Sequence, residues 1–146
     1  MKRFGYKAGI TLGLLLFAVG TFLFYPAAEM RHFGFFLFAL FVIASGLTML
    51  ETAANPYMTV LGDADSATQR LNFAQSFNGL AAFLAPLMGG TFILSGKTLS
   101  GGEQQSMSRE ELDSFLNAEA SSVQLPFLII GVTVLLVAVM IWRTAL

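Results

Sequence analysis

The sequence predicts an all-α membrane protein with four transmembrane helices. Of its 146 residues, 55% are hydrophobic and only 12% are charged, and the mean hydropathy is +0.71. Soluble domains carry roughly 25% charged residues. Four separate stretches each supply about 20 predominantly apolar residues, which is enough for a helix to cross roughly 30 Å of hydrocarbon. These observations together indicate a multi-pass membrane protein.

The expected spans cover residues 7–25, 33–61, 71–95 and 123–142. The first two are separated by a short segment beginning at Pro26, so we expect an antiparallel hairpin. Residues 62–70 form the next polar turn. The segment 96–122 is predicted to be a polar extracytoplasmic loop with one short helix, because Ser108-Arg-Glu-Glu111 matches the capping box that begins many helices.

Basic residues near the span ends predict the orientation, since cytoplasmic loops carry an excess of Lys and Arg. With both termini inside, five basic residues are cytoplasmic (Lys2, Arg3, Lys7, Arg70 and Arg143) and three are outside (Arg31, Lys97 and Arg109). We therefore expect the N-terminus and the C-terminus to be cytoplasmic.

Glu51 is the most informative residue, because it interrupts an otherwise apolar second span. A carboxylate at the bilayer centre costs roughly 2.5 to 3.5 kcal/mol, and such residues usually line a path for a proton, ion or solute. Asn55 follows one helical turn later on the same face, and Pro56 is expected to kink the helix. The alternative is a proline kink with Glu51 hydrogen-bonded inside a helix bundle.

The third span carries two amides, Gln75 and Asn78. They share one face of the helix with small residues and a proline, which are Gly79, Ala82, Pro86 and Gly89. Pro86 is a second expected kink. At about 1.5 Å per residue, Glu51 lies roughly 15 Å from the turn, Asn78 about 10 Å and Gln75 about 6 Å. Two readings stay open, which are interhelical hydrogen bonding and the lining of a polar cavity. Carboxylate and amide groups together suit sugar hydroxyls, which need both donors and acceptors.

Other classes of function find little support. The chain has no cysteine, its single histidine (His32) falls at a span end, and its net charge of −1 does not favour nucleic-acid binding. We find no phosphate-binding loop or nucleophile elbow, so the sequence indicates no enzyme, cofactor or metal. Arg70 is expected to hold the turn by meeting Asp63, Asp65 or a lipid phosphate.

Two long motifs carry a family resemblance: Leu50-Glu-Thr-Ala-Ala-Asn-Pro-Tyr-Met-Thr-Val-Leu-Gly62 and Arg70-Leu-Asn-Phe-Ala-Gln-Ser-Phe-Asn-Gly79. Together with Arg3-Phe-Gly-Tyr-Lys-Ala-Gly9, they resemble the fucose/proton symporter family, the glucose/galactose-type branch of the major facilitator superfamily. The resemblance extends over nearly the whole chain, through Trp142.

The resemblance implies a partial transporter domain over residues 1–146, which would be helices three to six of a twelve-helix protein. In that family the positions of Glu51, Gln75 and Asn78 line the central cavity, and the carboxylate is tied to proton coupling. The family's first two helices, with a further carboxylate, and its C-terminal half have no counterpart here. We therefore expect a fragment of a gene or a truncated open reading frame.

The resulting hypothesis is a segment of a proton-coupled monosaccharide permease of the bacterial inner membrane. Glu51, Gln75, Asn78 and Asn55 are its candidate substrate-binding residues, and Glu51 is also the candidate for proton coupling. Its partners would be a monosaccharide, a proton, the lipid bilayer and the missing helices of the full-length transporter, with no nucleic acid. The alternative is a small four-helix membrane scaffold or assembly subunit without transport activity. A third reading, a membrane hydrolase, would require a second catalytic group near Glu51.

Overall fold

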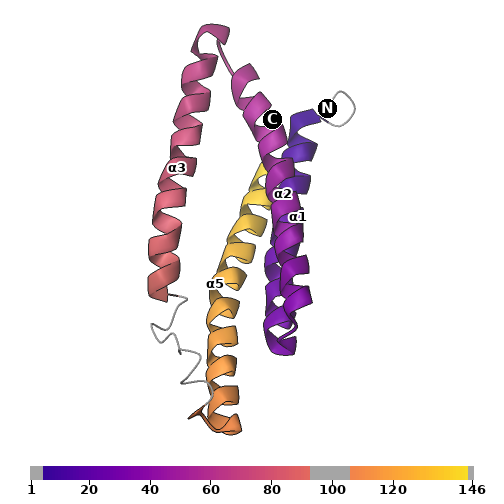
Figure 1. The fold of residues 1–146 in the computed structure, drawn as a ribbon. Coiled ribbons are helices and arrows are strands. Elements are labelled where there is room, and N and C mark those ends of the chain that lie inside the picture. Colours follow the sequence, from indigo (N-terminus) through magenta and orange to yellow (C-terminus); the bar gives the residue numbers. More distant parts are fainter. Residues whose placement is uncertain (1–4, 93–105, 145–146) are drawn as a thin grey trace.

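The computed structural model describes residues 5–92 and 106–144, and this part of the chain is helical without any strand. Its elements are α1 (Gly5–Met30), α2 (Phe33–Val60), the short 3-10 helix η1 (Ala64–Ser66), α3 (Ala67–Phe92) and α5 (Arg109–Arg143). Figure 1 shows α1, α2 and α5 running side by side, while α3 stands apart from them. The predicted all-α class is confirmed.

Helices α1 and α2 pack so closely that their backbones touch. A Cβ atom added at Gly46 of α2 would lie 2.5 Å from the backbone nitrogen of Phe17, and one added at Gly13 of α1 would lie 2.8 Å from that of Leu50. Small residues allow such an approach in membrane helices, where packing is not driven by the exclusion of water. The hairpin is therefore held by contact between its helix backbones.

Helix α5 lies along the same unit. Its Ala138 belongs to a buried cluster with Ile10 and Leu14 of α1 and Ala53 of α2. Further along, Phe127 stacks on Phe24 with ring centroids 3.9 Å apart. The three helices therefore share one apolar interior.

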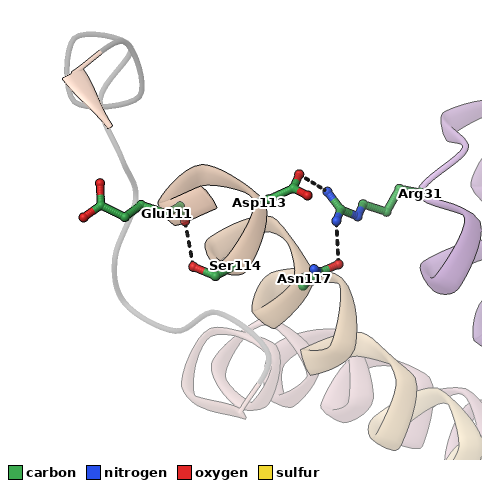
Figure 2. Close-up of polar contacts among 5 residues, drawn as sticks. All are labelled: Arg31, Glu111, Asp113, Ser114 and Asn117. Carbon is green, nitrogen blue, oxygen red and sulfur yellow. Dashed lines mark hydrogen bonds and ion pairs between the residues drawn. The ribbon is translucent and has the colours of Figure 1, made fainter. Parts of the chain in front are cut away.

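The turn between α1 and α2 is tied to the first turns of α5, as Figure 2 shows. The guanidinium of Arg31 donates to Asp113 Oδ1 at 3.0 Å and to Asn117 Oδ1 at 2.6 Å. Arg31 has a φ of +46°, so the chain reverses there in the left-handed region that a non-glycine residue adopts uncommonly. This backbone conformation directly follows α1.

Few of the described residues contact helix α3. It follows α2 through η1 and then diverges from the other helices (Figure 1). Between residues 72 and 91, every residue is exposed except Ala74 and Gly89, which are half-buried. The described part of the chain therefore contains one packed unit of three helices and one open helix.

The sequence predicts four spans, and the structure has four long helices. Three of these, α1, α2 and α5, are long and apolar enough to cross a membrane, and α3 is not among them. Its 26 residues are long enough, but every stretch of 18 residues within it includes Gln75 and Asn78, whose amides lower the hydropathy.

The structure departs from the expected loop at 96–122. Residues 93–105 lie outside the described residues, but Arg109 to Arg143 form one continuous helix in place of a short surface helix, a loop and a span. The capping box is confirmed: Glu111 N donates to Ser108 Oγ at 3.3 Å, and Ser108 N donates to the Glu111 carboxylate at 3.0 Å. No glycine interrupts residues 109–130, so the helix that begins there continues into the apolar segment.

All four prolines of the chain lie inside helices. Pro26 does not end α1, which continues to Met30 and is five residues longer at this end than the expected span. Pro56 and Pro86, the expected kinks, lie inside α2 and α3. Membrane helices tolerate proline when neighbouring groups satisfy the freed carbonyl.

Candidate functional site

Three amide side chains form a hydrogen-bonded chain between α2 and α3. Gln75 Nε2 on α3 donates to Asn55 Oδ1 on α2 at 2.9 Å. Asn78 Nδ2, one turn further along α3, donates to Gln75 Oε1 at 3.1 Å. The structure therefore brings together three of the four residues that the sequence proposes for substrate binding.

The α2 side of the site is set by helical periodicity. Ala53 is fully buried in the cluster shared with α1 and α5. Glu51 and Asn55 lie two residues before and after it, so they occupy the face turned away from that cluster. Glu51 is exposed and Asn55 is half-buried. This face is the one from which Asn55 reaches α3.

Glu51 does not join the amide chain. Within the described residues its carboxylate has no hydrogen bond or ion pair, although it lies one turn from Asn55 on the same face of α2. Both carboxylate oxygens are therefore available as acceptors beside the three amides.

The amides keep hydrogen-bonding capacity after bonding to one another. Each amide has two N–H donors and one acceptor oxygen. In bonds to other described residues, Asn55 uses only its oxygen, Gln75 uses one donor and its oxygen, and Asn78 uses one donor. Donors and an acceptor remain free next to the acceptors of Glu51. Such a mixture matches a polyhydroxylated ligand, whose hydroxyl groups both donate and accept.

Arg70 holds the turn before the site, but with partners other than the expected carboxylates. It donates to the backbone carbonyls of Met58, Thr59 and Asp63 and to the hydroxyl of Ser66. The expected ion pairs with the carboxylates of Asp63 and Asp65 are absent from the described residues. Backbone carbonyls at a helix C-terminus attract a cation as a carboxylate does, and sequence reasoning overlooked them.

His32 takes no part in the site. It is exposed at the N-cap position of α2, and its side chain makes no capping hydrogen bond. This placement fits the expectation of a residue at a span end.

Comparison with known proteins identifies relatives over nearly the whole chain. It is 47% identical over 145 residues to the L-fucose-proton symporter of Escherichia coli, covering 99% of this chain and 33% of that protein. It is 42% identical over 139 residues to a glucose/galactose transporter of Brucella abortus, covering 95% of this chain and 30% of that protein. A scan against protein-family models finds no match.

Solved structures agree with the sequence relatives. A crystal structure of a major facilitator superfamily transporter, FucP, in the outward conformation matches with a TM-score of 0.87 at 47% identity. The match covers 99% of this chain and 35% of that one. A variant of the E. coli fucose:proton symporter matches with a TM-score of 0.88 at 46% identity. The chain thus spans about a third of the length of these relatives and has the fold of that part of them.

Proposed function

Because the chain is homologous to a third of the fucose-proton symporters and glucose/galactose transporters, we propose that it is a segment of a proton-coupled sugar permease. The substrate would be a monosaccharide, moved across the bacterial inner membrane by alternating access. Transporters of this kind rock two halves of the protein around a site near the bilayer midplane. The proposed permease therefore includes helices beyond those of this chain.

The observation that carries the proposal is the polar face between α2 and α3. The amides of Asn55, Gln75 and Asn78 form one connected group, and the carboxylate of Glu51 lies on the same face of α2 as Asn55. We propose that the three amides orient the sugar by donating to and accepting from its hydroxyls. Glu51 would accept a hydrogen bond from the sugar and carry the coupled proton.

The proposed site lies in the membrane, with both termini of the chain in the cytoplasm. The apolar character of α1, α2 and α5 supports membrane insertion, and the distribution of basic residues supports the orientation. In this arrangement Arg70 and the turn it holds face the cytoplasm, whereas Arg31 lies on the opposite side.

The decisive experiment replaces Glu51 in the complete polypeptide that the gene encodes, reconstituted into liposomes. Uptake of radiolabelled L-fucose, glucose and galactose is measured under an imposed proton gradient, and counterflow is measured without one. We expect Glu51→Gln to reduce proton-driven uptake to the level of protein-free liposomes while counterflow persists, because an amide still bonds to the sugar but carries no exchangeable acidic proton.

Glu29→Gln is the matched control, since it makes the same change at an exposed acid near the end of α1. It should leave both activities unchanged. Wild-type rates of uptake and counterflow in Glu51→Gln would remove Glu51 from the mechanism. Failure of the unmutated protein to move any of the three sugars would contradict the proposed substrate class.

A scaffold without transport activity is the second candidate, and the hydrogen bond between Asn55 and Gln75 favours it because such bonds also join membrane helices. The two candidates differ in what Asn78→Leu does. Asn78 is exposed, and among the described residues its side chain bonds only within α3, so a scaffold would tolerate the change. A permease would lose affinity for its sugar, measured as a raised KM.

A further inference from the structure

Arg70 donates hydrogen bonds to backbone carbonyl groups at the C-terminal end of α2. The last four carbonyls of a helix have no partner within it, and in α2 these belong to Tyr57, Met58, Thr59 and Val60. Leu61 N donates to Tyr57 O at 3.1 Å. Arg70 Nε donates to Met58 O at 3.3 Å, and Arg70 Nη2 donates to Thr59 O at 3.4 Å. One side chain from α3 therefore supplies donors to two of the four carbonyls.

The same guanidinium also holds the connecting turn. Arg70 Nη1 donates to Asp63 O at 3.0 Å and to the hydroxyl of Ser66. Gly62, the residue before Asp63, reverses the chain with a φ of +86°, and a Cβ atom there would lie 3.5 Å from Nη1. The planar guanidinium presents five donors in a fixed arrangement, which a lysine ammonium cannot reproduce. Arg70 thus links the end of α2, the turn and the first turn of α3.

This linkage matters because α3 has few other attachments to the described part of the chain. Its side chains are exposed along residues 75–88, and Figure 1 shows it diverging from the other helices beyond the turn. Gln75 follows Arg70 by five residues, about 7.5 Å along the helix. A change in the direction of α3 at the turn would separate Gln75 from Asn55, the residue to which it bonds across the helices.

We propose that Arg70 is a positioning residue for the candidate site, which sets the direction of α3 by capping the C-terminus of α2. It does not touch the ligand. It acts by holding Gln75 and Asn78 opposite the face of Glu51 and Asn55. The importance of this role for sugar binding rests on the proposed function, whereas the role in placing α3 can be tested without any sugar.

The first test measures the placement of α3 in the complete polypeptide, with any cysteine outside these 146 residues replaced by serine. The chain contains no cysteine, so Leu47→Cys on α2 and Leu80→Cys on α3 give a defined spin-labelled pair at two exposed positions. Pulsed electron paramagnetic resonance in lipid nanodiscs should show one narrow distance distribution. Arg70→Gln should shift the mean distance and about double the width of the distribution. It removes the contacts at the turn that fix the direction of α3, and Leu80 lies about 20 Å along the helix from that turn.

Two variants serve as controls for this measurement. Arg109→Gln removes the same charge from an exposed residue in the first turn of α5 and should leave the distribution unchanged. Arg70→Lys keeps the charge without the planar group of donors and should give an intermediate width. An unchanged distribution in Arg70→Gln would overturn the proposal, as would equal widening in Arg109→Gln.

The second test measures how closely residues 55 and 75 approach each other, using the substitutions Asn55→Cys and Gln75→Cys. The native side chains at these positions are hydrogen-bonded. The rate of disulfide formation should fall about tenfold on adding Arg70→Gln, because a displacement near 1 Å can change the rate of an oriented reaction substantially. An unchanged rate would show that Arg70 does not position the amides, and would overturn the proposal even if α3 moves further along.

The third test connects the position of α3 to transport. In the complete polypeptide, Arg70→Gln should raise the KM for monosaccharide uptake about tenfold with kcat nearly retained, because the amides that orient the sugar are displaced while Glu51 remains. Arg70→Lys should recover part of the affinity. A lowered kcat with unchanged KM would overturn a role in positioning the amides. Absence of uptake by the unmutated protein would refute the proposed function alone, since the first two tests then decide the role of Arg70.

Discussion

The packed unit of α1, α2 and α5 and the open helix α3 are held by different kinds of contact. In the packed unit, glycines bring helices close enough for atoms of one backbone to touch those of the next, as at Gly13, Gly20 and Gly46. In α3, an added Cβ atom at Gly79, Gly89 or Gly90 would have no described residue within 4 Å. Its attachments to α2 include the polar bonds of Arg70 and Gln75.

This difference teaches where each kind of residue acts. Apolar and small residues hold α1, α2 and α5 together, so changes there should act on stability. Polar residues connect α3 to α2 beside the candidate site, so substitutions there should change the affinity for the ligand. The two sets of residues meet on α2, where Ala53 faces the packed unit and Asn55 bonds to α3.

The largest effect is expected at Gly46. A methyl group at Gly46→Ala would lie 2.5 Å from the nitrogen and 2.8 Å from the Cα atom of Phe17, and 2.9 Å from the carbonyl oxygen of Gly13. These are backbone atoms, which cannot move away by changing rotamer. We expect a loss of about 2 to 3 kcal/mol in the stability of the hairpin, measured as loss of energy transfer between dyes on α1 and α2 during titration with a denaturing detergent.

Gly79→Ala is the matched control for this comparison. The same methyl group meets open space at Gly79, and alanine favours helix over glycine by up to about 1 kcal/mol. Stability should stay the same or rise slightly. Equal destabilisation by both substitutions would show that close packing does not distinguish the two regions.

A smaller effect is expected at the tie between the α1–α2 turn and α5. The ion pair of Arg31 with Asp113 is solvent-accessible, with side-chain exposures of 33% and 68%, and exposed pairs contribute about 0.2 to 1 kcal/mol. A double-mutant cycle with Arg31→Gln and Asp113→Asn should give a coupling energy in this range, decreasing with added salt. A coupling well above it, or one insensitive to salt, would contradict the assignment as an exposed pair.

The smallest effect is expected at Thr11, which is 5% exposed and whose hydroxyl has no hydrogen-bond partner within the described residues. Thr11→Val removes an unsatisfied polar group and keeps the shape, so stability should be unchanged or rise by up to about 1 kcal/mol. Thr21 is the contrasting position, because its buried hydroxyl donates to Ala18 O at 2.7 Å. Thr21→Val should destabilise by about 1 kcal/mol, and the opposite order in the same detergent titration would refute this account.

The fold could be predicted from the sequence where hydropathy and helix length decide the outcome. The expected second span at residues 33–61 agrees with α2, which ends at Val60. The length of α5 was missed, because a polar segment after a capping box is typical of a short surface helix. Arg31 ties this segment to the turn between α1 and α2 by bonding to Asp113 and Asn117 across more than eighty residues of sequence. Such a long-range contact leaves no periodic pattern.

The candidate site could be predicted in its residues but not in its connections. Helical spacing places Asn55 with Glu51 and Gln75 with Asn78 on their own faces, and the structure joins Asn55 to Gln75. The partners of Arg70 were predicted from charge alone, which favours Asp63 and Asp65. Arg70 instead bonds to carbonyls at the end of α2 that have no partner within the helix. These carbonyls can be identified only once the last residue of that helix is known.

The backbone contact between α1 and α2 also bears on how the protein is made. Its partners, such as Gly13 and Leu50 or Gly46 and Phe17, are separated by fewer than forty residues, so they leave the ribosome close together in time and close only a short loop. We expect this pair to enter the bilayer as a preassembled hairpin. Helix α5, which follows them along the chain, then docks onto a surface that α1 and α2 already form.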